Sequence, residues 1–253
     1  RYIKSEETTT NSFHLVSDLA DNLISEVYFS TKETATDQIS PAGQNMPSIT
    51  IDEAFGYEFV AGPDIFRMAN DLDTENTFFK AKLTYYQNNH KITAGFENSV
   101  YDTYNVFIVD EDGSYEFDSL ATLQAGQIAS YSASGSKTGN VADAAADFEY
   151  DLQSMYVMDE YSMSDNVTLT FGLRHDEYSG DDTPTNASFL STYGFKNGGI
   201  KGTDLTTYRF GADIVLDDMS DLNITYGTYS AKLPNVWISN AYTNTGTNIA
   251  NYN

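Results

Sequence analysis

Hydrophobic and polar residues alternate with a period of two along much of the chain. The clearest segment is 166–178, one face of which carries Val167, Leu169, Phe171 and Leu173. The pattern recurs at residues 77–86, 91–99, 148–158 and 204–216, and more weakly at 12–17, 22–31 and 221–230. Such alternation predicts β-strands with one apolar face, and no helical periodicity of comparable length competes with it. We therefore expect an all-β, antiparallel chain of about eight strands.

The connections between these segments alternate between short and long. Turns rich in Asn, Asp and Ser are predicted at 18–21, 88–89, 164–166 and 217–220. Long segments separate the resulting hairpins at 32–73, 101–147, 179–203 and 231–253. Long loops are uncommon in compact domains, but outer-membrane barrels combine short periplasmic turns with long extracellular loops. The sorting of loops by length therefore favours a transmembrane β-barrel.

The amino-acid composition excludes several classes of protein and function. The 13 Lys and Arg residues against 37 Asp and Glu residues give a net charge of −24, which would repel nucleic acid. The absence of Cys excludes disulfides and thiolate chemistry, and no apolar run is long enough for a membrane-spanning helix. The 19 Tyr and 15 Phe residues suit the aromatic girdles of an outer-membrane barrel. No nucleophile elbow, HExxH sequence or phosphate-binding loop occurs, so we do not expect an enzyme.

In a barrel the apolar strand faces meet lipid and the polar faces line the lumen. We assign all the apolar faces above to the lipid, and in segment 148–158 this face consists of Phe148, Tyr150, Leu152, Tyr156 and Met158. The lumen faces of two neighbouring strands then carry Arg174, Asp176, Arg209 and Asp213. These residues are candidates for contacting a plug or lining a substrate path. The alternative interpretation is a ladder of ion pairs that stiffens the barrel wall.

One predicted outer loop offers oxygen ligands for a cation. The sequence SGDDTPTN (179–186) contains Asp181, Asp182 and Asn186, whose side-chain oxygens suit Ca²⁺. A structural calcium ion bound there is the one cofactor that the sequence suggests.

Three sequence blocks together resemble a known family. They read HKITAGFENSVYDTYNVFIVDEDGSYEFDSL (90–120), LTFGLRHD (169–176) and KLPNVWISNAYTNTG (232–246). In this order and spacing they resemble TonB-dependent outer-membrane receptors of the Oar-like subgroup. Members of that subgroup carry a carboxypeptidase-regulatory-like domain ahead of a plug. The resemblance covers roughly residues 60–250.

This resemblance implies a transporter of the Gram-negative outer membrane, with a plugged barrel of about 22 strands and a TonB box. The chain, residues 1–253, would be a single domain forming an interior part of that barrel, without the plug and N-terminal domains. Implied partners are the TonB complex, reached through the N-terminal region, and the lipid and lipopolysaccharide of the membrane. Long acidic extracellular loops would capture a peptide, siderophore or glycan for passage through the lumen. The loop candidates for ligand contact are Trp237, Asn240 and Tyr242.

Two other interpretations stay open at this point. Eight strands closing on themselves would form a small outer-membrane barrel acting as an adhesin or structural anchor. The third interpretation is a secreted, soluble β-sandwich that binds a ligand. The soluble fold requires a shared buried core, whereas a barrel exposes the same residues to lipid: Phe79, Leu83, Phe171, Phe210 and Ile214.

Overall fold

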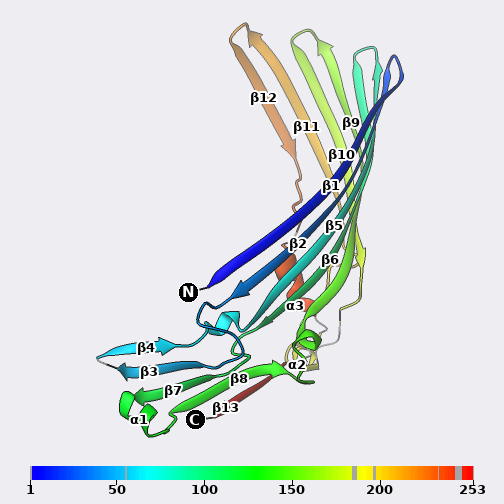
Figure 1. Ribbon diagram of the computed structural model, residues 1–253. Coiled ribbons are helices and arrows are strands. Elements are labelled where there is room, and N and C mark those ends of the chain that lie inside the picture. The colour runs from blue at the N-terminus through cyan, green and yellow to red at the C-terminus, as the bar shows by residue number, and fades with distance from the viewer. Residues whose placement is uncertain are drawn as a thin grey trace.

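The computed structural model describes residues 2–54, 56–183, 187–195, 198–232, 234–242 and 247–252. Most of these residues belong to one antiparallel sheet of eight strands (Figure 1). In spatial order the strands are β1 (Ile3–Ala20), β2 (Leu23–Ile39), β5 (Ala69–Gln87), β6 (His90–Ile108), β9 (Ala146–Ser164), β10 (Val167–Gly180), β11 (Asp204–Asp217) and β12 (Ser220–Gly227). Spatial order follows chain order, and the expected all-β fold class is confirmed.

Four hairpins build this sheet, and their tight turns gather at one end, the upper end in Figure 1. The turns fall where the Asn-, Asp- and Ser-rich sequences predict them. The strands are longer than the alternation alone indicated. Each of β5, β6 and β9 contains 19 residues. A tilted strand crosses a bilayer with about 9–11 residues, so these strands extend well beyond it on the side of the long loops.

The long loops contain structure of their own at the opposite end of the main sheet (Figure 1). A five-stranded sheet joins them, in the order β13 (Thr247–Tyr252), β8 (Ser130–Ser136), β7 (Ser114–Ser119), β3 (Ser48–Ala54) and β4 (Tyr57–Ala61). The short helices are η1 (Ile65–Arg67), α1 (Leu120–Gln124), η2 (Val141–Ala144), α2 (Ala187–Tyr193) and α3 (Asn235–Tyr242). Among the described residues, no helix is long and apolar enough to span a membrane.

One face of the main sheet presents large apolar side chains without any cover. The exposed fractions of Leu83, Phe171 and Phe210 are 47%, 45% and 46%. Cross-strand pairing places Phe171 directly opposite Phe210, and the two rings meet edge to face at 5.9 Å. A soluble sandwich would bury these side chains in a shared core, so their exposure excludes that interpretation. A wall that meets lipid requires such a face.

The lipid assignment of segment 148–158 is wrong. Directly opposite residues of an antiparallel pair share a face, and Tyr156 lies opposite Arg174. The alternation along β9 therefore places Met155 and Val157 on the apolar face. The residues predicted to face lipid lie on the polar face instead: Phe148, Tyr150, Leu152, Tyr156 and Met158. For Phe148 and Tyr150 the physical reason is that the start of β9 lies outside the bilayer, where apolar side chains need not face lipid. Tyr156 instead contacts the Arg174 guanidinium on the polar face, 5.8 Å from the centre of its ring.

The buried clusters of the molecule lie toward the loop end, and the largest one explains these aromatic residues. Phe148 and Tyr150 are 2% and 0% exposed, because the loops fold over them. The other members of this cluster are Ala146, Ile200, Ile238 and Tyr242. Two smaller clusters centre on Val106 with Ile108, and on Ile51 with Phe117.

Beyond the apolar band, the same face of the main sheet becomes acidic. Glu33 lies directly opposite Glu75, and Glu75 lies opposite Asp102. Asp102 in turn lies opposite Glu149. These four carboxylates form an unbroken row across β2, β5, β6 and β9, which we call the acidic row. Like charges placed directly opposite one another destabilise a sheet.

Candidate lumenal site

The polar face carries a connected network centred on Arg174 of β10. Its guanidinium contacts Glu97 of β6 at 2.9 Å, and Asp176 and Ser154 at 2.8 Å each. The side chain of Asp176 is only 8% exposed, and it also accepts hydrogen bonds from Ser154 at 2.6 Å and Ser230 at 3.2 Å. The bond from Arg174 to Asp176 lies within β10, whereas the others join β10 to β9, to β6 beyond it, or to the segment after β12. The network therefore holds β6, β9, β10 and the segment after β12 together.

A second group of charges lies on the same face, nearer the first strands. Glu26 of β2 accepts from Lys80 and Lys82 of β5, each at 2.5 Å. His14 of β1 lies 3.7 Å from the same carboxylate. These contacts continue the cross-strand ion pairs along the wall, so the polar face is neutralised locally although the chain is strongly acidic.

The structure places the four predicted lumen residues on one face but groups only some of them. Arg174 and Asp176 are direct partners, and Arg209 lies on the next strand, opposite Gly172. Asp213 lies further along β11, opposite Thr168, where it accepts a hydrogen bond from Asn223 of β12. Arg209 has no carboxylate partner among the described residues. Its guanidinium carbon instead lies 5.3 Å from the centre of the Tyr229 ring.

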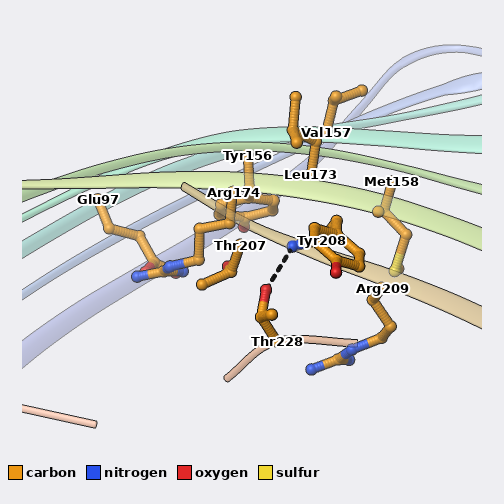
Figure 2. A pocket seen from close by; sticks show the side chains of 11 residues that line it. Glu97, Tyr156, Val157, Met158, Leu173, Arg174, Thr207, Tyr208, Arg209 and Thr228 are labelled. Carbon is orange, nitrogen blue, oxygen red and sulfur yellow. Dashed lines mark hydrogen bonds and ion pairs between the residues drawn. The ribbon is translucent and has the colours of Figure 1, made fainter. Parts of the chain in front are cut away.

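Two adjoining cavities open beside these residues. The first has a volume of about 250 Å³ and runs between Glu97, Tyr156, Arg174 and Arg209. Figure 2 shows the guanidinium of Arg174 beside Glu97, whereas that of Arg209 extends away from this pair. Thr228 closes one side, because its hydroxyl accepts from the backbone nitrogen of Tyr208 at 3.1 Å (Figure 2). The second cavity, about 530 Å³, shares Arg174 and Arg209 and continues toward the loops.

The sequence analysis missed a lysine at the far wall of the second cavity. The amino nitrogen of Lys232 lies 3.3 Å from the centre of the Tyr101 ring and 5.7 Å from that of Tyr150. The two rings stack at 4.9 Å. Although the side chain as a whole is exposed, desolvation of its partly buried ammonium lowers the pKa of Lys232 to about 8. The one sequence signal was its position at the start of the KLPNVW block.

The segment after Lys232 is fixed to the strands by polar and aromatic contacts. The side-chain oxygen of Asn235 accepts from the Tyr150 hydroxyl at 2.8 Å, and its nitrogen donates to Thr103 at 3.2 Å. The ring of Tyr242 stacks on Phe148 at 4.1 Å, and its hydroxyl donates to the Asp181 backbone oxygen at 3.3 Å. Helix α3 therefore packs over the outer part of β9.

The remaining predicted residues are placed as follows. Trp237 and Asn240 belong to α3, but their side chains lie outside the described part of the structure, as does all of Asn186. Asp181 accepts from the backbone nitrogen of Glu149 at 3.0 Å, and Asp182 pairs with Lys201 at 3.0 Å. Within the described ranges, no group of three or more acidic or histidine side chains is arranged to hold a metal ion.

Comparison with solved structures relates the main sheet to larger barrels. The closed form of the ferric-catecholate import receptor Fiu of E. coli K12 matches 88% of the chain at 14% identity, with a TM-score of 0.52. Its open form matches 88% at 14% identity and 0.50, and the copper transporter OprC matches 88% at 11% and 0.50. The chain spans only 33%, 35% and 29% of these structures, so it corresponds to about a third of each. These likenesses concern the fold.

Comparison with curated proteins gives no match. A family model described as "Outer membrane beta barrel domain" matches residues 5–244, almost the whole chain. This match agrees with the exposed apolar face and the ion-paired polar face of the main sheet. It also agrees with the arrangement of the connections, which are short turns at one end of the sheet and long loops at the other. The chain therefore belongs to the outer membrane beta-barrel domain family, and it resides in the outer membrane of a Gram-negative bacterium.

Proposed function

We propose that this chain is an interior part of the barrel of a TonB-dependent transporter, of the Oar-like subgroup that its sequence blocks resemble. The substrate is captured at the loop end and moves along the polar face of the main sheet. The observation that carries the proposal is the pair of contrasting faces in a sheet that matches about a third of two transport receptors. One of those receptors imports ferric catecholates and the other transports copper, so the comparison does not indicate a substrate for this chain.

In this proposal the polar face is the lumen wall. Arg174 and Asp176 hold neighbouring strands at a fixed spacing, and Arg209 and Asp213 line the path or contact the plug. The TonB complex supplies the energy through an N-terminal region, and the acidic row faces lipopolysaccharide. Trp237, Asn240 and Tyr242 belong to the loop region that first meets the substrate.

The open edges of the main sheet support a larger barrel over the small self-contained one. In the described chain, β1 and β12 are the two ends of the sheet and do not pair with each other. Each unpaired backbone group in lipid costs several kcal/mol, so strands beyond these eight are expected to close the wall. An eight-stranded adhesin or anchor would instead need direct pairing of β1 with β12.

The first experiment measures the parent protein. We expect an intact mass far above 28.0 kDa and a gel mobility in detergent that changes on heating, as for large outer-membrane barrels. A mass near 28.0 kDa with the same heat response would replace transport by adhesion or anchoring.

The second experiment tests energy coupling. Strains lacking either this receptor or TonB are grown with peptides, siderophores or glycans as the limiting nutrient. We expect both deletions to abolish use of the same nutrient, and the complete receptor to restore it only where TonB is present. Uptake that survives the loss of TonB would contradict the proposal.

A further inference from the structure

Basic side chains line the second cavity of the polar face, although the chain is strongly acidic. Arg174, Arg209 and Lys232 line it, against two carboxylates, Asp176 and Asp204. The chain as a whole carries a net charge of −24, so a cavity with more cations than carboxylates departs sharply from the average surface.

The three cations differ in whether a carboxylate already pairs with them. Arg174 is neutralised by Glu97 and Asp176, and all three of its guanidinium nitrogens donate to neighbours. In contrast, Arg209 and Lys232 have no ion-pair partner among the residues that the structure describes. Asp176 accepts from Arg174, Ser154 and Ser230, and it makes no ion pair with Arg209 or Lys232 in the described structure.

Aromatic rings position both of these cations without neutralising them. The Arg209 guanidinium lies over Tyr229, and the Lys232 amino group lies over Tyr101. A cation held on a ring face keeps its remaining N–H donors for a ligand. The fork of arginine donors suits the two oxygens of a carboxylate or phosphate, and a lysine adds a point charge.

We propose that this cavity binds an anionic ligand whose carboxylate or phosphate groups pair with Arg209 on β11 and with Lys232 at the loop end of the cavity. Its volume of about 530 Å³ is within the range of small-molecule sites. Tyr178 and Tyr229 line the cavity beside the charges and contact the apolar part of the ligand. The inference names a cargo class for the proposed transporter and depends on that function for its biological role, but the binding itself does not.

Binding is tested on the complete receptor, purified in an uncharged detergent at about pH 7, where both cations are charged. The probes are benzoate and inorganic phosphate, with neutral benzamide as the control for benzoate, each followed by calorimetric titration. We expect benzoate or phosphate to bind, and benzoate to bind more tightly than benzamide. Binding of benzoate alone assigns a carboxylate site, and binding of phosphate alone assigns a phosphate site.

Substitutions locate the site. Arg209→Gln and Lys232→Gln each remove the charge-assisted contact at one end of the cavity, so we expect each variant to weaken binding of the anionic probe at that end about tenfold or more. Lys32→Gln is the matched control, because Lys32 also lies on the polar face and lacks an ion pair in the described structure but does not line the cavity. It should change the affinity less than about twofold. Arg209→Lys, which keeps the charge, should retain part of the binding.

Folding of each variant is checked by its heat-dependent gel mobility. The inference is overturned if neither anion binds, if benzamide binds as well as benzoate, or if folded Arg209→Gln and Lys232→Gln variants bind like the wild type. These measurements need neither TonB nor a membrane potential. A receptor that binds the anion but does not support TonB-dependent uptake would therefore contradict the transport proposal while leaving the binding site intact.

Discussion

At the scale of single residues, Arg174 is the clearest case of a side chain fixed by its partners. Replacement by Met leaves the carboxylate of Asp176, which is 8% exposed, without its main donor. We expect Arg174→Met to lower the free energy of unfolding by about 1.5–3 kcal/mol, because a buried charged acceptor loses its partner. Urea unfolding of the barrel in detergent measures this. Arg209→Met is the matched control on the same face, and the loss of its ring contact should cost about 1 kcal/mol or less.

Lys232 provides a prediction about pH at the same scale. Its pKa in the folded protein is about 8, below the ordinary value of 10.5, because burial desolvates the ammonium. The unfolded chain therefore holds this proton more tightly. The charged lysine destabilises the fold below the folded pKa, and this penalty disappears as the pH rises from about 8 to about 10.5.

The measurement is the rate of acylation of the Lys232 amine as a function of pH, read by mass spectrometry. We expect a midpoint near pH 8 in the wild type. Tyr101→Ala removes the nearest ring and should move the midpoint up toward 10.5, because water then reaches the ammonium. An unchanged midpoint in this variant would show that the ring does not cause the shift.

At the scale of strands, the two faces of β10 make opposite predictions. Phe171→Arg places a charge in the lipid near the bilayer midplane and should cost about 2–4 kcal/mol of unfolding free energy. Thr170→Arg, one position along the same strand, points to the polar face and should cost less than about 1 kcal/mol. Unfolding from lipid vesicles compares the two variants. Equal costs at the two positions would contradict the assignment of the faces.

The hairpins of the main sheet were predictable because local signals specify them. Period-two alternation and Asn- and Asp-rich turns act over a few residues, and they also placed Arg174 and Arg209 on one face. The same rule failed for Phe148 and Tyr150, because it assumed that lipid covers every apolar position. These side chains lie beyond the bilayer, and α3, which follows them at a great distance along the chain, buries them.

The contacts of the candidate site were less predictable for a related reason. Glu97 and Ser154 meet Arg174 only because β6, β9 and β10 are neighbours in the correct register. Lys232 meets Tyr101 across an even longer stretch of sequence. The loop sheet is also non-local, since β3 pairs in parallel with β7, and β13 pairs with β8. Short strands whose partners lie in other loops leave little periodicity for sequence analysis to detect.

At the scale of the whole molecule, the acidic row combines with a net charge of −24 to make stability depend on salt. Carboxylates facing one another across strands repel, and mobile ions screen this repulsion. We expect the unfolding free energy in detergent to rise as NaCl increases from about 50 to about 500 mM. Glu75→Gln should reduce this dependence, because Glu75 lies between Glu33 and Asp102. Glu58→Gln, in β4 and outside the row, is the matched control. Salt dependence that is identical in both variants would contradict a role for the row.

The arrangement of the strands also has a consequence for how the chain is assembled. Every strand of the main sheet pairs with the strands next to it in that sheet's chain order, so four hairpins can form in sequence, each with little loop-closure entropy. The five-stranded sheet has the opposite character, because its members come from three different loops. The pairs β3–β4 and β7–β8 can form within their own loops, but β3 can meet β7, and β8 can meet β13, only after the hairpins have brought the loops to a common end. We therefore expect these two pairings to form last, after the wall beneath them is complete.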